Sequence, residues 1–333
     1  MHDLLTLVRK GLAQPERVPQ YLSQHAPSKV GEARQEGYRR WRSIQRQKPR
    51  IQEFVAQDEF ALIILDACRY DAFEAISDGY LRGDLSEVWS AGHWTGEYVH
   101  NTWDGFHDLT YVNPSPVISQ FYTEERGRAD WTDPETYFGD VIPAWDTHWD
   151  RDLKTTPADV ITDLALGAIA DMDRTRLVAH YLQPHFPYIG EYRLPELVRD
   201  DEVPFRERVD QDGETVTNHW REKAKAGEVS QHEIRRAYAS NLIYALKEVQ
   251  RLVRALDCPV VVTADHGEHL GEGGRWSHQA SSRWTRVVPW LEVESVGGEG
   301  GNPFETIEHT RRDERPTADA DVEQRLADLG YAE

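Results

Sequence analysis

The residues that most constrain the fold are Val261–His278, where an apolar run leads directly into a series of carboxylates and imidazoles. Phe60–Asp66 has the same form, a continuous apolar run that ends in a carboxylate. Runs of this kind are typical of parallel strands, which are covered on both faces of the sheet. Ligands of open α/β sheets bind at the carboxyl ends of such strands. The two segments therefore predict an α/β fold with a site where these strands end.

Further helices and strands are expected between and after these two segments. A proline opens the first helix, and apolar residues at helical spacing mark the second, longer one. The helices are predicted at residues 157–172 and 231–256, and the strands at 176–182, 259–263 and 287–293. Residues 89–152 are rich in aromatic residues, glycine and proline. We interpret them as loops around one edge of the site, with short extended pieces such as residues 109–112.

Composition divides the chain into an N-terminal arm and one domain. Residues 1–50 form a basic arm in which prolines separate two predicted helices, and residues 51–333 are long enough for one large α/β domain. Within that domain, residues 190–228 are polar and contain prolines, which indicates an inserted excursion. The glycine-rich, acidic stretch at 294–317 is predicted to be mobile.

The net charge is −20, from 58 acidic residues against 38 basic ones, and only 7 of the basic residues are lysine. A surface so dense in carboxylates repels itself unless salt screens the repulsion. The composition resembles that of haloarchaeal proteins, so we predict a halophilic protein. Binding to nucleic acid needs clustered lysine and arginine, and the acidic balance argues against it.

The arm is the exception to this acidity. It carries eleven Lys or Arg against four Asp or Glu, a net +7, which leaves −27 for the other residues. It is either a solvated arm that packs on the acidic body or a contact for an anionic glycan, a lipid surface or a partner. No apolar run is long enough to span a bilayer, and no signal peptide is recognisable. We expect a cytoplasmic protein with reduced Cys68 and Cys258, and membrane association through the arm is the alternative.

Three polar residues at the predicted strand ends have the character of metal ligands. Asp66 and Asp265 each end a core strand, and His266 follows the second carboxylate at once. Carboxylates combined with an imidazole suit zinc or manganese, whereas oxygen ligands alone would suit calcium or magnesium. Gly267 then allows a sharp turn. An isolated Asp-His-Gly is also compatible with a plain strand-end turn, so the wider context decides.

That context resembles the alkaline phosphatase and sulfatase superfamily. Residues 263–272, with the sequence TADHGEHLGE, match its C-terminal metal motif. The spacing from there to His278 is most similar to phosphoethanolamine transferases and to sulfatase-like proteins of haloarchaea. The resemblance also includes residues 60–71, 183–187 and 326–331, and so spans roughly residues 55–333. It implies an alkaline-phosphatase-like three-layer α/β/α sandwich with a mostly parallel central sheet.

The resemblance also implies roles for individual residues. The ligands of a divalent ion would be Asp66, Thr95, Asp265 and His266. Zinc or manganese is favoured, calcium is the alternative, and a second ion would fit. Thr95 would also be the nucleophile, at a helix start whose N–H groups receive the anionic ester, with Ser90 as the alternative. His185 and His278 match the family's histidines that bind the substrate anion or a second metal.

Two sequence features bear on the reaction. The chain lacks the Cys-x-Pro-x-Arg motif of formylglycine sulfatases and its serine form, and Cys68 lies too close to Asp66 to be the nucleophile. An unmodified threonine favours phosphoryl transfer over sulfate ester hydrolysis. Arg69 is either a bidentate ligand for a charged substrate oxygen or the partner of a neighbouring acid such as Asp71.

We therefore predict that residues 51–333 form the catalytic domain of a metal-dependent hydrolase. Its substrate would be a phosphate or sulfate ester, which could be attached to a glycan or a lipid. Thr95 would form a covalent intermediate with the transferred group. One alternative is a transferase that passes the phospho- or sulfo-linked group to a surface glycan or lipid. The other is a non-catalytic, metal-binding relative. The sequence does not indicate an oligomeric state.

Overall fold

A computed structural model describes residues 31–119, 133–197 and 219–294. The chain divides into two compact units, residues 1–45 and 46–333. In the first unit, the described part is a helix over residues 31–41. The division falls before the expected boundary at residue 50, because helix α3 (Gln47–Val55) begins at Gln47, whose side chain is buried in the second unit.

A sheet of eight strands runs through the second unit, in the order β1-β3-β10-β7-β2-β6-β4-β5. Strands β7, β2, β6, β4 and β5 are mutually parallel, and β10 lies antiparallel between β3 and β7. The strands are β1 (Gln45–Arg46), β2 (Phe60–Leu65), β3 (Gly83–Trp89), β4 (His107–Asn113), β5 (Phe138–Pro143), β6 (Arg176–Tyr181), β7 (Val260–Ala264) and β10 (Val287–Val293). A separate two-stranded hairpin consists of β8 (His269–Leu270) and β9 (Trp276–Ser277).

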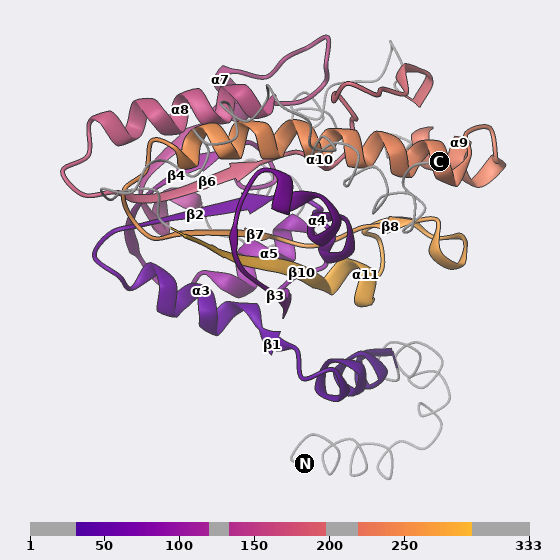
Figure 1. The fold of residues 1–333 in the computed structure, drawn as a ribbon, viewed down its shortest axis with the longest axis horizontal. Helices are drawn as coiled ribbons and strands as arrows, with labels where there is room; N and C mark the ends of the chain where they lie inside the picture. The colour runs from indigo at the N-terminus through magenta and orange to yellow at the C-terminus, as the bar shows by residue number, and fades with distance from the viewer. Residues whose placement is uncertain (1–30, 120–132, 198–218, 295–333) are drawn as a thin grey trace, which may run out of the picture. The chain divides into compact units, whose positions relative to one another are not determined.

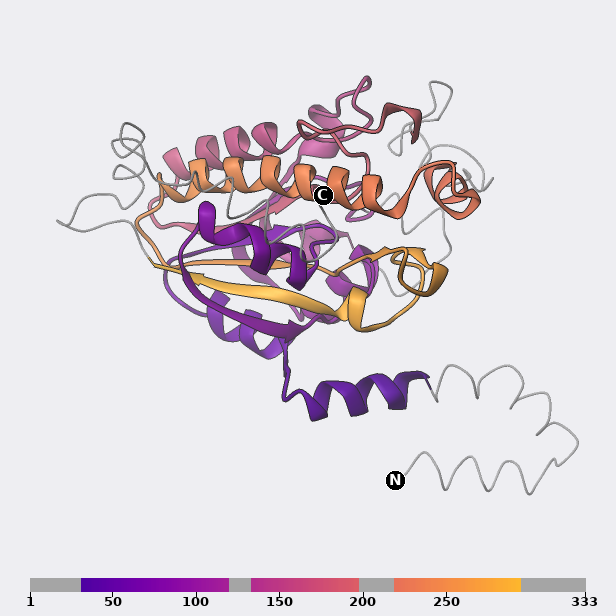
Figure 2. The same cartoon turned by 45° about the vertical axis from the view of Figure 1, so that its right-hand side comes forward.

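Helices cover both faces of this sheet, as Figures 1 and 2 show. Helices α8 (Ala158–Ala170) and α10 (Gln231–Val253) pack together on one face, and α3 and α5 (Thr95–Thr102) pack together on the other. The remaining α-helices are α4 (Tyr70–Ile76), α7 (Ala144–Thr147), α9 (His219–Ala226) and α11 (Arg283–Arg286). The predicted three-layer α/β/α sandwich with a mostly parallel sheet is confirmed.

The central strand β2 lies between β6 and β7, and all six of its side chains are buried. Its continuous apolar run is therefore explained by cover on both faces. Helix α10 begins at a capping box formed by Ser230 and Glu233, which satisfies backbone N–H groups at the helix start. This start of α10 lies at the end of the molecule where strands β2 and β7 finish, since Gln231 Nε2 donates to Leu270 O at 2.6 Å, and the long helix then runs back along the sheet.

The interpretation of residues 89–152 as loops is wrong for part of that segment, although the extended piece expected at residues 109–112 is confirmed as part of β4. The segment contains α5 and two strands of the main sheet, β4 and β5. These strands are hard to recognise because polar residues interrupt them, as in HDLTYVN for β4, and because the edge strand β5 is half exposed. Of the expected excursion at 190–228, the structure describes residues 190–197 and 219–228, while the expected mobile stretch at 294–317 lies almost wholly outside the described residues.

Among the residues that the structure describes, no helix combines the length and the apolar character needed to cross a membrane. Cys68 and Cys258 are both buried and are not joined in a disulfide.

Candidate active site

Three neighbouring parallel strands deliver the predicted site residues to one edge of the sheet. Asp66 follows β2, Asp265 follows β7, and His185 lies in the loop after β6. Backbone contacts fix the three segments against one another: the Asp66 N–H donates to Tyr181 O at 2.9 Å, and the His185 N–H donates to Asp66 O at 3.1 Å. The carboxyl ends of parallel strands meet at one edge, which is why residues far apart in sequence converge here.

The first ligand group consists of Asp66, Asp265 and His266, whose ligand atoms all lie within 4.8 Å of one another. His266 Nε2 is 3.3 Å from Asp66 Oδ1 and 3.4 Å from Asp265 Oδ2. Its other ring nitrogen, Nδ1, lies 2.9 Å from Gly267 O, an arrangement in which Nδ1–H donates to the carbonyl and Nε2 faces the two carboxylates. All three side chains are buried.

Thr95 lies beside the first ligand group. It is the first residue of α5, and its Oγ1 is 3.4 Å from His266 Nε2. Ser90, the alternative nucleophile, donates its hydroxyl hydrogen to Asp265 O and accepts the Gly92 N–H at 3.1 Å. Ser90 thus supports the turn that leads to α5, whereas the Thr95 hydroxyl faces the ligands.

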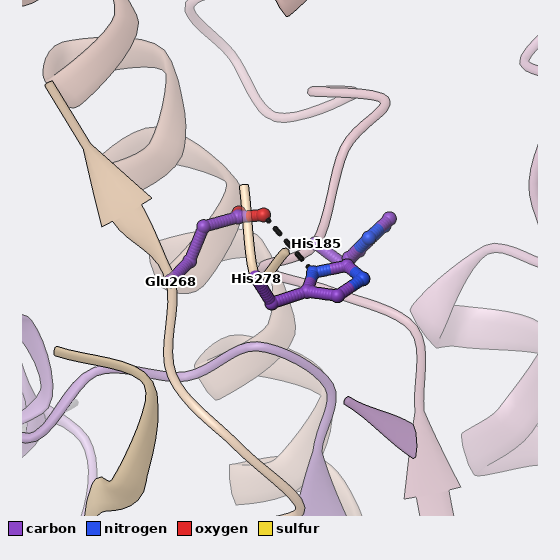
Figure 3. A group of neighbouring side chains, drawn as sticks. All are labelled: His185, Glu268 and His278. Atoms are coloured by element: carbon purple, nitrogen blue, oxygen red, sulfur yellow. Dashed lines mark hydrogen bonds and ion pairs between the residues drawn. The ribbon is translucent and has the colours of Figure 1, made fainter. Parts of the chain in front are cut away.

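The second ligand group consists of His185, Glu268 and His278, again with ligand atoms within 4.8 Å of one another. Figure 3 shows the three side chains converging, with Glu268 Oε1 3.4 Å from His278 Nδ1. The His278 ring connects the two ligand groups, because its centroid lies 5.2 Å from that of His185 and 4.5 Å from that of His266. The structure thus brings His185 and His278 together next to Asp66 and Asp265.

Glu268 is a site residue that the sequence analysis missed. Its side chain is fully buried, and its Oε2 accepts no hydrogen bond from any described residue. The available signal was its place directly after Asp-His-Gly, within the matched motif. A buried carboxylate without a full set of partners is costly unless a cation or a proton neutralises it.

The electrostatics of the first ligand group also favour a bound positive charge. Burial, followed by the charge of Asp66, raises the pKa of Asp265 to about 7. Burial would raise the pKa of Asp66 as well, but the charges of His185 and His266 outweigh it and lower that pKa. Burial opposes protonation of His266, yet Asp265 and Asp66 raise its pKa to about 9. The two carboxylates therefore attract either a proton or a metal cation to the space between them.

The residues present fit a divalent cation in both ligand groups. Asp66 Oδ1, Asp265 Oδ2 and Glu268 Oε2 are buried oxygens without a hydrogen-bond donor among the described residues. Two carboxylates with one imidazole, and two imidazoles with one carboxylate, are donor sets that suit zinc or manganese. His180 is buried next to these ligands, with Nε2 3.9 Å from Asp265 Oδ2 and Nδ1 2.9 Å from the Tyr111 hydroxyl.

Arg69 does not point into either ligand group. Its guanidinium donates to both oxygens of Asp71, at 2.8 and 2.5 Å, and its side chain is 2 % exposed. Of the two alternatives for this residue, the structure places it with a neighbouring acid.

The sulfatase family profile matches residues 85–309. No curated protein matches the chain. Among solved structures, the soluble domain of lipooligosaccharide phosphoethanolamine transferase A from Neisseria meningitidis is 13 % identical, covers 82 % of this chain and 87 % of its own, and has a TM-score of 0.43.

Two other solved structures are similar at the same level. The C-terminal periplasmic domain of EcEptC from Escherichia coli, in complex with zinc, is 12 % identical over 81 % of each chain, with a TM-score of 0.46. Phosphonate monoester hydrolase of Agrobacterium radiobacter is 15 % identical over 71 % of this chain and 68 % of its own, with a TM-score of 0.43. Because the family profile covers more than half of the sequence, this chain belongs to the sulfatase family, within the alkaline phosphatase superfamily.

Proposed function

We propose that this protein is a divalent-metal-dependent enzyme that cleaves a phosphate or sulfate ester, with Thr95 as its nucleophile. The observation that carries the proposal is the meeting of two buried ligand groups with the Thr95 hydroxyl at the ends of β2, β6 and β7. Zinc or manganese is the ion that these donors favour, and calcium is the alternative. Membership in the sulfatase family supports ester cleavage as the reaction class.

In this proposal Thr95 attacks the central phosphorus or sulfur of the ester. A divalent cation, when bound, lowers the pKa of a hydroxyl nucleophile and stabilises the developing negative charge. The Thr95 oxygen forms a bond to phosphorus or sulfur as the bond to the leaving alkoxide breaks. The proton of the Thr95 hydroxyl passes to solvent, and the alkoxide takes up a proton from solvent and leaves as an alcohol. The first backbone N–H groups of α5, which begins at Thr95, would receive the anionic ester. His185 and His278, in the second ligand group, bind the remaining oxygens or a second ion.

The covalent ester on Thr95 then passes its group to an acceptor. Water as the acceptor makes the protein a hydrolase, and a hydroxyl of a glycan or lipid makes it a transferase. Both reactions share the first step and the same residues. A phosphate ester is the preferred substrate, because the chain lacks the motif that yields formylglycine and because Cys68 is buried with its thiol pKa raised by that burial.

Substitution of Asp265 tests the proposal. Asp265→Asn removes one carboxylate charge from the first ligand group with almost no change in volume, and we expect loss of the metal bound there. Turnover of p-nitrophenyl phosphate should fall by about 10³-fold or more, because both the ion and the nucleophile next to it are affected. Metal content by mass spectrometry and initial rates with and without a lipid-linked acceptor are the measurements.

Asp163→Asn is the matched control, since that carboxylate is 69 % exposed on α8 and pairs with Arg251 far from the site. It should keep full metal content and turnover. An Asp265→Asn protein with stoichiometric metal in the first ligand group, or with unchanged turnover of phosphate and sulfate esters, would contradict the proposed function.

A further inference from the structure

Arg69 is a buried arginine that joins the two loops from which most of the ligands come. It lies three residues after Asp66, between β2 and α4. Besides its bidentate pair with Asp71, it donates from Nη1 to Glu272 Oε1 at 2.5 Å. Glu272 belongs to the loop after β7, and its Oε2 accepts the Leu270 N–H at 2.7 Å. One guanidinium therefore bridges the Asp66 turn and the loop that carries Glu268.

The loop from Gly267 to Glu272 follows a path that Arg69 and Trp284 define. The Arg69 guanidinium lies over the Trp284 ring, with its carbon 4.5 Å from the ring centroid, and Nη1 is 3.5 Å from Glu268 O. A Cβ atom at Gly267 would lie 2.3 Å from Trp284 O and 3.5 Å from Arg69 Cγ. The backbone at Gly267 is thus held closely against the Trp284 backbone and the Arg69 side chain, and Glu268 is buried on the inner side of the loop.

The first ligand group has its own, separate support. Asp66 is tied to β6 through the hydrogen bond to Tyr181 O. Asp265 Oδ1 accepts the Ala67 N–H at 3.1 Å, and Gln47 Nε2 donates to Ala264 O at 2.7 Å, directly before Asp265. The positions of these ligands are therefore fixed by the strands of the sheet and their hydrogen bonds, whereas Glu268 lies beyond the end of β7 in a loop.

We propose that the Arg69–Glu272 pair is a positioning element that holds Glu268 in place for a divalent ion bound by the second ligand group. The inference rests on the metal dependence in the proposed function and adds residues that touch neither the ion nor the substrate. Residues that orient metal ligands typically change metal affinity by about 10- to 100-fold when they are removed. A pair that orients Glu268 alone should affect one ion and spare the other.

Zinc titration of the full chain, stripped of metal, tests this inference. Arg69→Met removes the guanidinium, and Glu272→Gln removes one charge without changing the shape of the side chain. In both variants we expect the zinc held by the second ligand group to bind about 10- to 100-fold more weakly, and the other zinc to change by less than about 3-fold. Arg69→Lys keeps the charge but not the bidentate geometry, so its affinity should lie between those of Arg69→Met and the wild type.

Arg50→Met is the matched control. Arg50 has the same kind of surroundings on the far side of the sheet: its guanidinium carbon is 4.5 Å from the Trp290 ring centroid, and Nη2 is 2.6 Å from Glu292 Oε1. This variant loses a stacked, ion-paired arginine but should bind both zinc ions as the wild type does. Glu268→Gln shows which zinc belongs to which ligand group. It should abolish zinc binding by the second ligand group and leave the zinc of the first in place.

The outcomes separate the two proposals. The positioning role is overturned if folded Glu272→Gln binds both zinc ions more weakly by the same factor, or binds both with unchanged affinity. If Arg69→Met does not fold, the isosteric Glu272→Gln decides. If the wild-type protein binds only one zinc, the positioning role is overturned, but the proposed metal site in the first ligand group is not contradicted. Wild-type protein that binds no zinc, manganese or calcium contradicts the proposed function as well.

Discussion

Two hydroxyl side chains precede or begin α5, and their surroundings distinguish them. Ser90 is fully buried, and its oxygen is engaged by Asp265 O and by the Gly92 N–H. Thr95 is 7 % exposed, starts the helix and faces His266. A nucleophile must be reachable by substrate and close to the groups that activate it. Thr95 meets both conditions, and Ser90 has a role in holding the turn.

Replacement of Thr95 should therefore separate catalysis from folding. We expect Thr95→Ala to lower kcat by about 10³-fold or more, because no other described hydroxyl lies as close to His266, and Thr95→Ser to keep a measurable rate. Thr102→Ala, at the other end of α5 and also buried, is the matched control and should keep its rate. Steady-state kinetics with a thermal melt for each variant are sufficient. A folded Ser90→Ala protein without activity, next to an active Thr95→Ala protein, would reassign the nucleophile to Ser90.

At the scale of elements, α10 fixes the loop that carries His185. Asn241, fully buried on this helix, donates from Nδ2 to Pro184 O and His185 O at 3.1 Å and to Pro187 O at 3.3 Å. Its Oδ1 accepts the N–H groups of Ile189 at 2.9 Å and Gly190 at 3.2 Å. One amide side chain thus satisfies the backbone of a whole loop.

Asn241→Ala should destabilise the fold by about 2–4 kcal/mol, because several buried backbone groups lose their partner at about 1 kcal/mol or more each. Urea unfolding gives the free energy, and hydrogen exchange should show faster exchange in the peptide that contains Ile189 and Gly190. The control is Asn101→Ala, which removes one exposed hydrogen bond to Ala91 O and should change stability by less than about 1 kcal/mol. Unchanged exchange in that loop would show that α10 does not hold it.

The turn before α5 requires glycine at position 92, because there is no space for a side chain there. A Cβ atom there would lie 2.2 Å from Tyr98 N, a backbone atom of α5. Gly92→Ala should therefore destabilise the protein by about 1–3 kcal/mol and displace Thr95, with a fall in turnover. Gly167→Ala is the opposite case, because nothing lies within 4 Å of its Cβ position on α8, and it should stabilise by about 0.5–1 kcal/mol. Melting temperatures that shift in the same direction for both variants would refute this account.

Elements with a continuous apolar run could be predicted from sequence, and those defined by tertiary contacts could not. Residues 60–65 and 287–293 are strands with the expected limits, because they are covered on both faces. Strands β4 and β5 lie toward one edge of the sheet, where polar residues are tolerated, so the sequence pattern indicates only residues 109–112 of β4 and does not indicate β5. Glu268 is visible as part of a motif, but its inward direction depends on contacts with Arg69 and Trp284 that no local pattern encodes.

At the scale of the whole molecule, the dominant feature is excess negative charge. The chain carries −20, and the residues after the basic arm carry −27. Surface ion pairs such as Arg251–Asp163 offset this only weakly, since an exposed pair contributes about 0–1 kcal/mol. Repulsion among the carboxylates, which outnumber the basic residues, acts over a screening length of about 10 Å at 0.1 M salt and about 3 Å at 1 M.

Salt should therefore stabilise this protein, because it screens more repulsion than attraction. We expect the melting temperature to rise by about 5 °C or more between 0.1 M and 1 M KCl, since each kcal/mol of relieved repulsion raises it by about 2–4 °C in a domain of this size. Calorimetry in KCl, with choline chloride as a second monovalent salt, separates screening from binding of potassium. The same rise in both salts supports screening, and a rise in KCl alone indicates bound potassium instead. A melting temperature that falls with KCl would mean that the ion pairs outweigh the repulsion, and that the acidic composition does not reflect adaptation to salt.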